Sequence, residues 1–204
     1  MRYFLKKYAV LLSLAIASIL ILIATLQYAG GTIQDKNTIG FDWSRNFFSN
    51  LFQENSLNGL PNLGRIWAIF GMIFYSLGNG VFFINMSKKI SDKQATLVLK
   101  IVGYSEILFN FLIATPLHDS MVTITSTLTL LGLFYITIFS FKTSLHLLKI
   151  GCVLSMLVFY YTLFLYGTGN WGLLAIMQKV TIIGNMLLVI SIEHFVQKED
   201  FHLK

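Results

Sequence analysis

The stretch AVLLSLAIASILILIATL, residues 9–26, decides the fold class. It contains no charged residue and no proline, so nothing in it interrupts an apolar helix. The hydrocarbon core of a bilayer is about 30 Å thick, and a helix that rises about 1.5 Å per residue crosses it in about 20 residues. The strands of a membrane barrel alternate apolar and polar residues, which this stretch does not do. The run therefore predicts a membrane-spanning helix over approximately residues 9–28.

Five more apolar runs of similar length follow. They cover approximately residues 65–86, 96–117, 121–141, 150–167 and 171–194. Because a backbone that faces lipid must satisfy its own hydrogen bonds, each run is predicted to be a helix. The sequence thus predicts an all-α fold, a polytopic membrane bundle of six transmembrane helices, with residues 1–204 forming a single integral membrane domain.

The basic start MRYFLKK is also typical of a secretory signal peptide. The apolar part that follows it is longer than the roughly 7–15 residues of such peptides, and no convincing cleavage site comes after it. We therefore expect the first run to be retained as a span.

The composition agrees with a membrane protein and argues against nucleic-acid binding. Hydrophobic residues make up 55% of the chain and charged residues 12%, with a mean hydropathy of +0.70. Soluble domains carry about 25% charged residues, so this chain could not cover a surface that faces water. The net charge of +6 comes from basic residues in small groups between the apolar runs. A nucleic-acid-binding domain gathers such residues on one face, so membrane lipids are the expected partners and nucleic acid is not.

The basic residues also predict the orientation, because cytoplasmic loops are enriched in lysine and arginine. With the N-terminus in the cytoplasm, eleven of the 15 basic residues lie inside. Lys36, Arg45 and Arg65 lie outside, and Lys179 falls within a span. We therefore expect a multi-pass protein of the cell (inner) membrane with both termini cytoplasmic and one long outer loop, residues 29–64.

The segment FDWSRNFFSNLF, residues 41–52, lies in this outer loop. On a helix its large apolar residues take one side and its polar residues the other, at the spacing of an amphipathic face. The apolar side holds Trp43, Phe47, Phe48, Leu51 and Phe52, and the polar side holds Asp42, Arg45, Asn46, Ser49 and Gln53. Aromatic residues in such a segment suit the membrane interface. The segment predicts a short amphipathic interfacial helix, either an anchor or a lid whose polar side faces a cavity.

Two charged residues fall deep within spans, where they cost at least about 2.5–3.5 kcal/mol on insertion scales and so need partners. Glu106 in the third run and Lys179 in the sixth lie at depths that differ by only about 5 Å at the rise of a helix. They are predicted to pair directly or through Asn110, and Gln178 adds polar capacity. The alternatives left open are a structural ion pair, a polar centre coupled to protons or substrate, and side chains that face different directions.

A second polar cluster is predicted at the outer mouth of the bundle, as a ligand-binding site made of Asp42, Arg45, Asn46, Arg65, His118 and Asp119. Arginines there would meet a lipid phosphate with two hydrogen bonds. A histidine beside an aspartate suggests an acid–base pair or metal ligands. However, adjacent residues on a helix point about 100° apart, and polar residues in an outer turn are ordinary.

Other motifs point away from a metal or a cofactor. His118 is expected outside, while His146, His194 and His202 are expected inside, so they cannot converge as a zinc hydrolase requires. Cys152 is the one cysteine, which excludes an intramolecular disulfide and a cysteine-based metal site. There is no phosphate-binding glycine loop, GxSxG or HExxH. We expect no cofactor, no metal and no catalytic residues.

Three short features occur in one layout: FSNLF at residues 48–52 followed by Asn62, a glycine-bearing second span, and TPLHD at residues 115–119. This layout resembles a loosely defined group of bacterial six-span proteins of unknown function, distantly related to the DRAM-type autophagy modulators. The typical loop of that group has an acidic residue after the serine, where this chain has Asn50. The resemblance covers most of the chain in topology and implies a six-helix bundle. It implies no activity, because the group has no agreed one.

Three hypotheses for the function follow. The first is a non-enzymatic membrane protein that binds or senses a lipid or other amphiphile at its outer face. The second is a small transporter, or a transporter subunit, that uses a Glu106/Lys179 pair. The third is a membrane-embedded hydrolase or transferase that uses His118 and Asp119, for which the sequence offers no nucleophile. A membrane-protein partner or a homo-oligomer is compatible with each.

Overall fold

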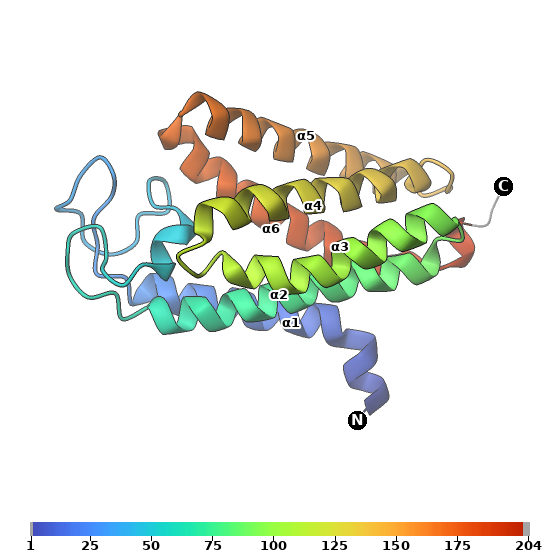
Figure 1. Ribbon diagram of the computed structural model, residues 1–204, viewed down its shortest axis with the longest axis horizontal. Helices are drawn as coiled ribbons and strands as arrows, with labels where there is room; N and C mark the ends of the chain where they lie inside the picture. Colours follow the sequence, from blue (N-terminus) through green and yellow to red (C-terminus); the bar gives the residue numbers. More distant parts are fainter. Residues whose placement is uncertain (1, 202–204) are drawn as a thin grey trace.

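Six α-helices make up the bundle in the computed structural model (Figure 1). The structure describes the backbone of residues 2–201 and the side chains of residues 7–201. The helices are α1 (Arg2–Leu26), α2 (Arg65–Lys89), α3 (Lys93–Leu112), α4 (His118–Ser140), α5 (His146–Thr168) and α6 (Trp171–Phe195). All six are long and apolar enough to cross a membrane, and the described residues contain no β-strand. The prediction of an all-α chain with six candidate spans is confirmed.

Short polar signals set the ends of several helices. The Asp92 carboxylate accepts a hydrogen bond from the Ala95 backbone N–H at 2.8 Å and caps α3, as the Asn170 side chain caps α6. Gly169, at φ 69°, adopts the left-handed conformation that ends α5. These caps allow tight turns, so consecutive helices run side by side as antiparallel neighbours (Figure 1).

The third helix ends earlier than predicted, at Leu112 and not near residue 117. Pro116 disfavours a helical conformation in the residue before it, and the Thr115 hydroxyl donates to the Leu112 carbonyl at 2.6 Å. The next helix then begins at His118, so Asp119 lies in its first turn, where the helix dipole favours a carboxylate.

The core lies where α2 packs between α1 and α3. Its fully buried apolar residues come from all six helices, among them Leu14, Phe82, Phe83, Met86, Leu99, Ile136, Cys152 and Ile192. The helix α6 contacts α5 on one side and α1 and α2 on the other. By contrast, α5 is peripheral, because Cys152 and Leu165 are its only buried residues.

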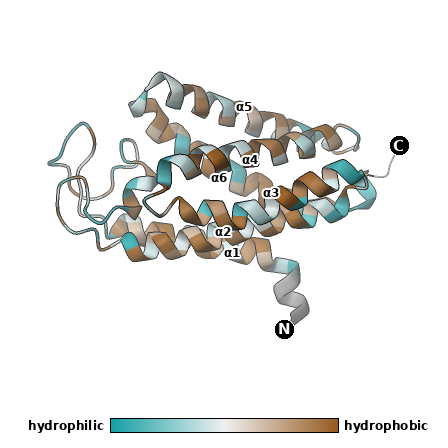
Figure 2. Cartoon of the chain, viewed as in Figure 1, coloured by the Kyte–Doolittle hydropathy of each residue, from teal (hydrophilic) through white to brown (hydrophobic). Residues whose placement is uncertain are grey.

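Hydropathy divides the molecule into an apolar body and polar ends (Figure 2). Hydrophobic residues cover the middle of the helices, whereas hydrophilic residues gather in the long loop and around the helix ends. Large apolar side chains such as Leu157 and Phe164 of α5 are more than half exposed. In a bilayer these side chains face lipid tails, which are as apolar as the protein core.

The loop of residues 29–64 folds over one end of the bundle, at the end where α3 turns into α4 and α5 into α6 (Figure 1). It contains two single-residue β-bridges, Gly30–Ile39 and Asn55–Pro61, and one short 3-10 helix, Phe48–Phe52. The start of α1 and the end of α6 lie away from the loop.

The prediction of one amphipathic helix over residues 41–52 is wrong. Residues 43–45 form a turn, and helical structure is limited to the five residues Phe48–Phe52. The Asp42 carboxylate accepts from the Ser44 N–H at 2.8 Å, and the Asn50 side chain accepts from the Phe47 N–H at 2.7 Å. Such local side-chain bonds compete with helix formation. Asn46, which the helix pattern had placed on the polar side, is buried, and so is Asn50.

The contact between α2 and α3 generates a prediction about stability. A Cβ atom at Gly103 would lie 2.7 Å from the Gly80 carbonyl oxygen and 3.0 Å from the Ile84 nitrogen. Because backbone atoms cannot move aside easily, we expect Gly103→Ala to destabilise the bundle by about 1–3 kcal/mol. Thermal unfolding in detergent micelles measures this.

Gly184→Ala is the matched control, because a Cβ atom at Gly184 in α6 meets nothing within 4 Å. It should unfold at the same temperature as the native chain or slightly above it. Equal loss of stability in both variants would contradict a close α2–α3 contact.

Candidate functional site

The predicted site residues occupy three separate places. The first is the contact between the loop and α6, with Asp42, Arg45, Asn46, Gln178 and Lys179. The second is a cleft at the same end of the bundle, with Arg65, His118 and Asp119. The third is the buried centre of the bundle, with Glu106 and Asn110. The predicted outer mouth is therefore divided between a structural contact and a cleft.

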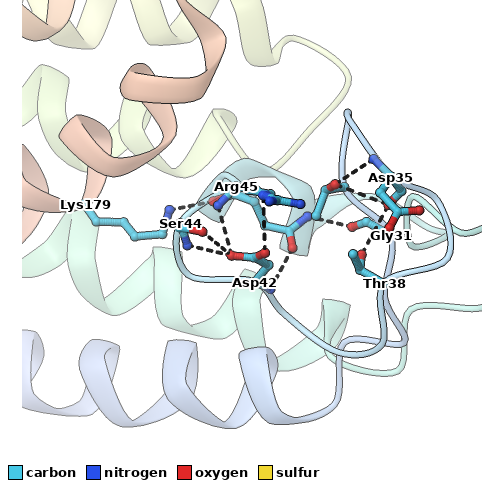
Figure 3. Close-up of polar contacts among 9 residues, drawn as sticks. Gly31, Asp35, Thr38, Asp42, Ser44, Arg45 and Lys179 are labelled. Atoms are coloured by element: carbon cyan, nitrogen blue, oxygen red, sulfur yellow. Dashed lines mark hydrogen bonds and ion pairs between the residues drawn. The ribbon is translucent and has the colours of Figure 1, made fainter.

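Lys179 joins α6 to the loop. Only 6% of its surface is exposed, and its Nζ donates to the carbonyl oxygens of Asn46 at 2.5 Å and Ala175 at 2.6 Å. The same Nζ lies 5.8 Å from the ring centroid of Phe41 and 5.5 Å from that of Phe48. Carbonyl oxygens and aromatic faces both stabilise a cation. Figure 3 shows this side chain extending from its helix towards the loop.

A neighbouring glutamine strengthens the same contact. The Gln178 side-chain oxygen accepts a hydrogen bond from the Phe48 N–H at 2.9 Å. The Asn46 amide then connects the docked segment to the rest of the loop, because its Nδ2 donates to the Gly31 carbonyl and its Oδ1 accepts from the Asp42 N–H, both at 2.8 Å. Two adjacent polar residues of a membrane helix thus hold the loop against the end of the bundle.

The remaining charged residues of this contact form a local turn. Asp42 lies 3.8 Å from Arg45, whose side chain is about half exposed. The hydrogen bond from the Ser44 hydroxyl, together with Arg45, lowers the pKa of Asp42. The ionised carboxylate therefore stabilises the turn at neutral pH, and this stabilisation is lost as the pH falls through the lowered pKa. Neither residue lines the cleft.

Tyr28 supports the loop from the end of α1. Its hydroxyl accepts a hydrogen bond from the Leu57 N–H at 3.0 Å, and its ring packs edge-on against Phe41. Burial raises the pKa of Tyr28, so the phenol stays neutral. These contacts tie Phe41 and Leu57 of the loop to the chain just after α1.

The cleft has a volume of about 450 Å³ and lies between the loop, the start of α2 and the turn from α3 to α4. It is lined by polar and apolar residues, namely Ser49, Phe52, Gln53, Glu54, Arg65, Ile113, Ala114, Thr115, Pro116, His118 and Asp119. His118 Nδ1 lies 2.8 Å from the Asp119 carboxylate, which orients the ring. Within the described residues there is no group of three or more histidine, cysteine or acidic side chains that could hold a metal ion.

Glu106 occupies the third place and is fully buried. One carboxylate oxygen accepts from the Thr129 hydroxyl of α4 at 2.7 Å, and the other accepts from the Asn110 side chain one turn along α3. No ion pair joins Glu106 to Lys179 or to any other described residue. The sequence left three alternatives open for Glu106 and Lys179. In the structure the two side chains face different sites.

Thr129, which bonds to Glu106, was not identified from the sequence. Thr129 is one of several threonines in α4, and such residues usually bond to their own helix backbone, so nothing marked it out. Ser49 was assigned only to the polar side of the predicted helix, although it lines the cleft with His118. Its place there depends on the fold of the loop, which the sequence pattern did not predict.

The contact between α6 and the loop gives the second prediction. Lys179→Met keeps the length of the side chain but removes its two hydrogen bonds. A hydrogen bond to a charged group contributes about 1.5–3 kcal/mol, so amide hydrogens in residues 41–52 should exchange about tenfold to a hundredfold faster. Hydrogen–deuterium exchange read by mass spectrometry measures this.

Lys100→Met is the control, because Lys100 is exposed on α3 and far along the chain from the loop. It should leave exchange in residues 41–52 unchanged. If Lys179→Met also left this exchange unchanged, the loop would not depend on the contact.

No family model, curated protein or solved structure matches this chain. The resemblance to the six-span group stays a prediction from short motifs. The function is argued from the geometry of the three places described above.

Proposed function

We propose that this chain is a multi-pass protein of the cell membrane with both termini in the cytoplasm and the loop of residues 29–64 outside. The charge distribution supports this orientation. Lys88, Lys89 and Lys93 lie around the turn from α2 to α3, and Lys142 lies beside the turn from α4 to α5, at the end away from the loop. Cytoplasmic segments carry such an excess of basic residues.

At its outer end the protein binds a phosphate-bearing amphiphile in the cleft. The observation that carries this proposal is the environment of Arg65. Its guanidinium forms no ion pair or side-chain hydrogen bond with the described part of the chain, although it lines a cleft of about 450 Å³. An arginine in such a position offers its planar donors to a phosphate group.

The surroundings of Arg65 suit the rest of an amphiphile. Leu63, Ile66, Trp67 and Phe70 are exposed around the first turns of α2, with 72%, 54%, 37% and 47% of their surfaces accessible. None of the four lines the cleft itself, but in a bilayer they would contact the acyl chains of a lipid held at this end of α2. The tryptophan suits the level of the lipid headgroups.

The acidic residues of the cleft indicate which kind of lipid headgroup it binds. Glu54 and Asp119 line it together with Arg65, so the cleft presents both signs of charge. Arg65 then binds the phosphate, and a carboxylate binds an amine. A phospholipid with an amine in its headgroup fits this arrangement better than an amphiphile that is only anionic.

One observation favours an enzyme as the second candidate. Ser49 lines the same cleft as His118 and Asp119. Its hydroxyl is a candidate nucleophile for acyl transfer, which the sequence analysis had not identified. No hydrogen bond joins Ser49 to His118 among the described residues, however, and a nucleophile needs its base within hydrogen-bonding reach. Lipid binding is therefore the function that the geometry supports best.

The transporter hypothesis loses its original basis, because it used Glu106 and Lys179 as a pair. Lys179 is bonded to Asn46 and Ala175, and Glu106 to Asn110 and Thr129. The two residues therefore do not form one polar centre.

The third prediction tests the cleft. Arg65→Gln should weaken binding of a phospholipid roughly 10- to 100-fold, because a hydrogen bond from a charged donor contributes about 1.5–3 kcal/mol. Native mass spectrometry of the purified protein, titrated with phosphatidylethanolamine and with diacylglycerol as the phosphate-free lipid, measures the preference.

Arg45→Gln is the matched control, since Arg45 lies in the loop at the same end of the bundle and is about half exposed, but does not line the cleft. It should retain the preference for the phospholipid. Equal losses in the two variants would mean that general charge attraction, and not the cleft, holds the lipid.

A further inference from the structure

The buried carboxyl of Glu106 lies near the middle of a membrane helix. It is six residues from the end of α3 at Leu112, or about 9 Å along the helix axis, and further from the other end at Lys93. Its relative exposure is 0%. Neither the loop nor the cleft includes it, so the lipid-binding proposal leaves this group without a role.

Both of its hydrogen-bond donors are neutral. Thr129 donates from α4, and Asn110 donates from α3 itself. A carboxylate in a water-free interior needs a cation beside it, or else it takes up a proton and becomes neutral. No described cation is beside it, so the environment favours uptake of a proton.

One titratable group on the helices around Glu106 lies near its carboxyl, and the others lie away from it. Among the described residues, Tyr75 of α2 is near enough for its charge to interact with that of Glu106. The remaining groups are Arg65, Lys88 and Lys89 at the ends of α2, Lys93, Lys100 and Tyr104 on α3 itself, His118, Asp119 and Tyr135 on α4, and Lys179, Glu193 and His194 on α6. Lys179 and Glu193 have partners of their own.

A chain of polar side chains continues from Glu106 across the bundle. Tyr75 is within hydrogen-bonding reach of Asn79 and Asn185. Asn185 Nδ2 donates to Asn79 Oδ1 at 3.2 Å, whereas Asn185 Oδ1 is buried and has no partner in the described part of the chain. An unsatisfied acceptor inside a membrane bundle is costly, so this oxygen is available to a further hydrogen-bond donor.

Asn185 also lines a cavity of about 290 Å³ between α5 and α6. The cavity wall contains the polar residues Ser155, Thr181 and Ser191 and the small residues Gly151 and Gly184. The rest of the wall is apolar, and the cavity has room for several water molecules. The polar chain thus leads from the buried carboxyl to a space at the side of the bundle.

We infer that Glu106 is a reversible proton-binding site inside the membrane, which exchanges protons with the cavity between α5 and α6 through Tyr75, Asn79 and Asn185. In this step one proton moves from a hydronium ion to a carboxylate oxygen, a water molecule is left behind, and one negative charge is removed. No atom is oxidised or reduced.

A metal cation is a poorer occupant of the same position. Glu106 is the only carboxylate there, and the two donors that point at its oxygens would have to turn away. Hard cations need about six oxygen ligands. The arrangement therefore favours a proton.

Infrared difference spectroscopy of the full chain in lipid vesicles tests the proposal. A carboxylic-acid C=O band should be present at acid pH, disappear as the pH is raised, and be missing in Glu106→Gln, in which a neutral amide takes the place of the acid. Glu193→Gln is the control, because Glu193 is a second partly buried glutamate but, unlike Glu106, has a cation beside it, with Lys89 at 3.7 Å. It should keep the band.

Two further variants distinguish loss of the site from loss of the fold. Glu106→Asp should keep a titrating band at a shifted frequency. Asn185→Leu should keep the band but slow its shift after transfer to heavy water at least severalfold, because the route to the cavity is blocked.

Three results would overturn the inference. A band that persists at every pH would make Glu106 a permanently protonated structural group. A carboxylate that stays ionised at every pH, and responds to sodium, would make it a cation site. An unchanged exchange rate in Asn185→Leu would reject the route.

Discussion

The absence of water from the core of a membrane is the constraint on which the rest of this structure depends. Each backbone bonds within its own helix, and each polar side chain must find its partner inside the protein. The two charges in the spans meet this requirement in opposite ways. Lys179 donates to two carbonyl oxygens and lies near two aromatic rings, and these contacts hold the loop. Glu106 has neutral donors alone, an environment that favours the neutral acid.

The Lys179 contact is structural, whereas the cleft and Glu106 are the proposed functional sites. The contact of Lys179 and Gln178 with the loop fixes the backbone of residues 46–48, and this backbone leads directly into the segment that forms one wall of the cleft. The cleft is therefore shaped by hydrogen bonds between the membrane helix α6 and the loop. A lipid bound beside Arg65 and a proton bound at Glu106 would occupy different parts of the same small bundle.

Much of the fold could be predicted from the sequence, because continuous apolar runs have few alternatives in a membrane. The six helices follow from this, and only local chemistry, such as Pro116 after α3, shifted their ends. The conformation of the loop was harder to predict. The side chains of Asp42 and Asn50 accept hydrogen bonds from nearby backbone groups, and these bonds compete with the helix that the aromatic spacing predicted. The partners of Glu106 and Lys179 could not be predicted either. Equal depth in the membrane does not say which way two side chains point, and Thr129 carries no signal that distinguishes it from its neighbours.

The measurement that tests the account most directly is the sidedness of the two ends of the bundle. In a chain with its one cysteine replaced, Cys152→Ala, the exposed positions Lys36 in the loop and Ser144 between α4 and α5 accept new cysteines. In intact cells an impermeant maleimide should label Lys36→Cys from outside and should reach Ser144→Cys only after the membrane is opened. Labelling of both positions from the same side, or the reverse order, would contradict a bundle that crosses the membrane with its loop and cleft facing outwards.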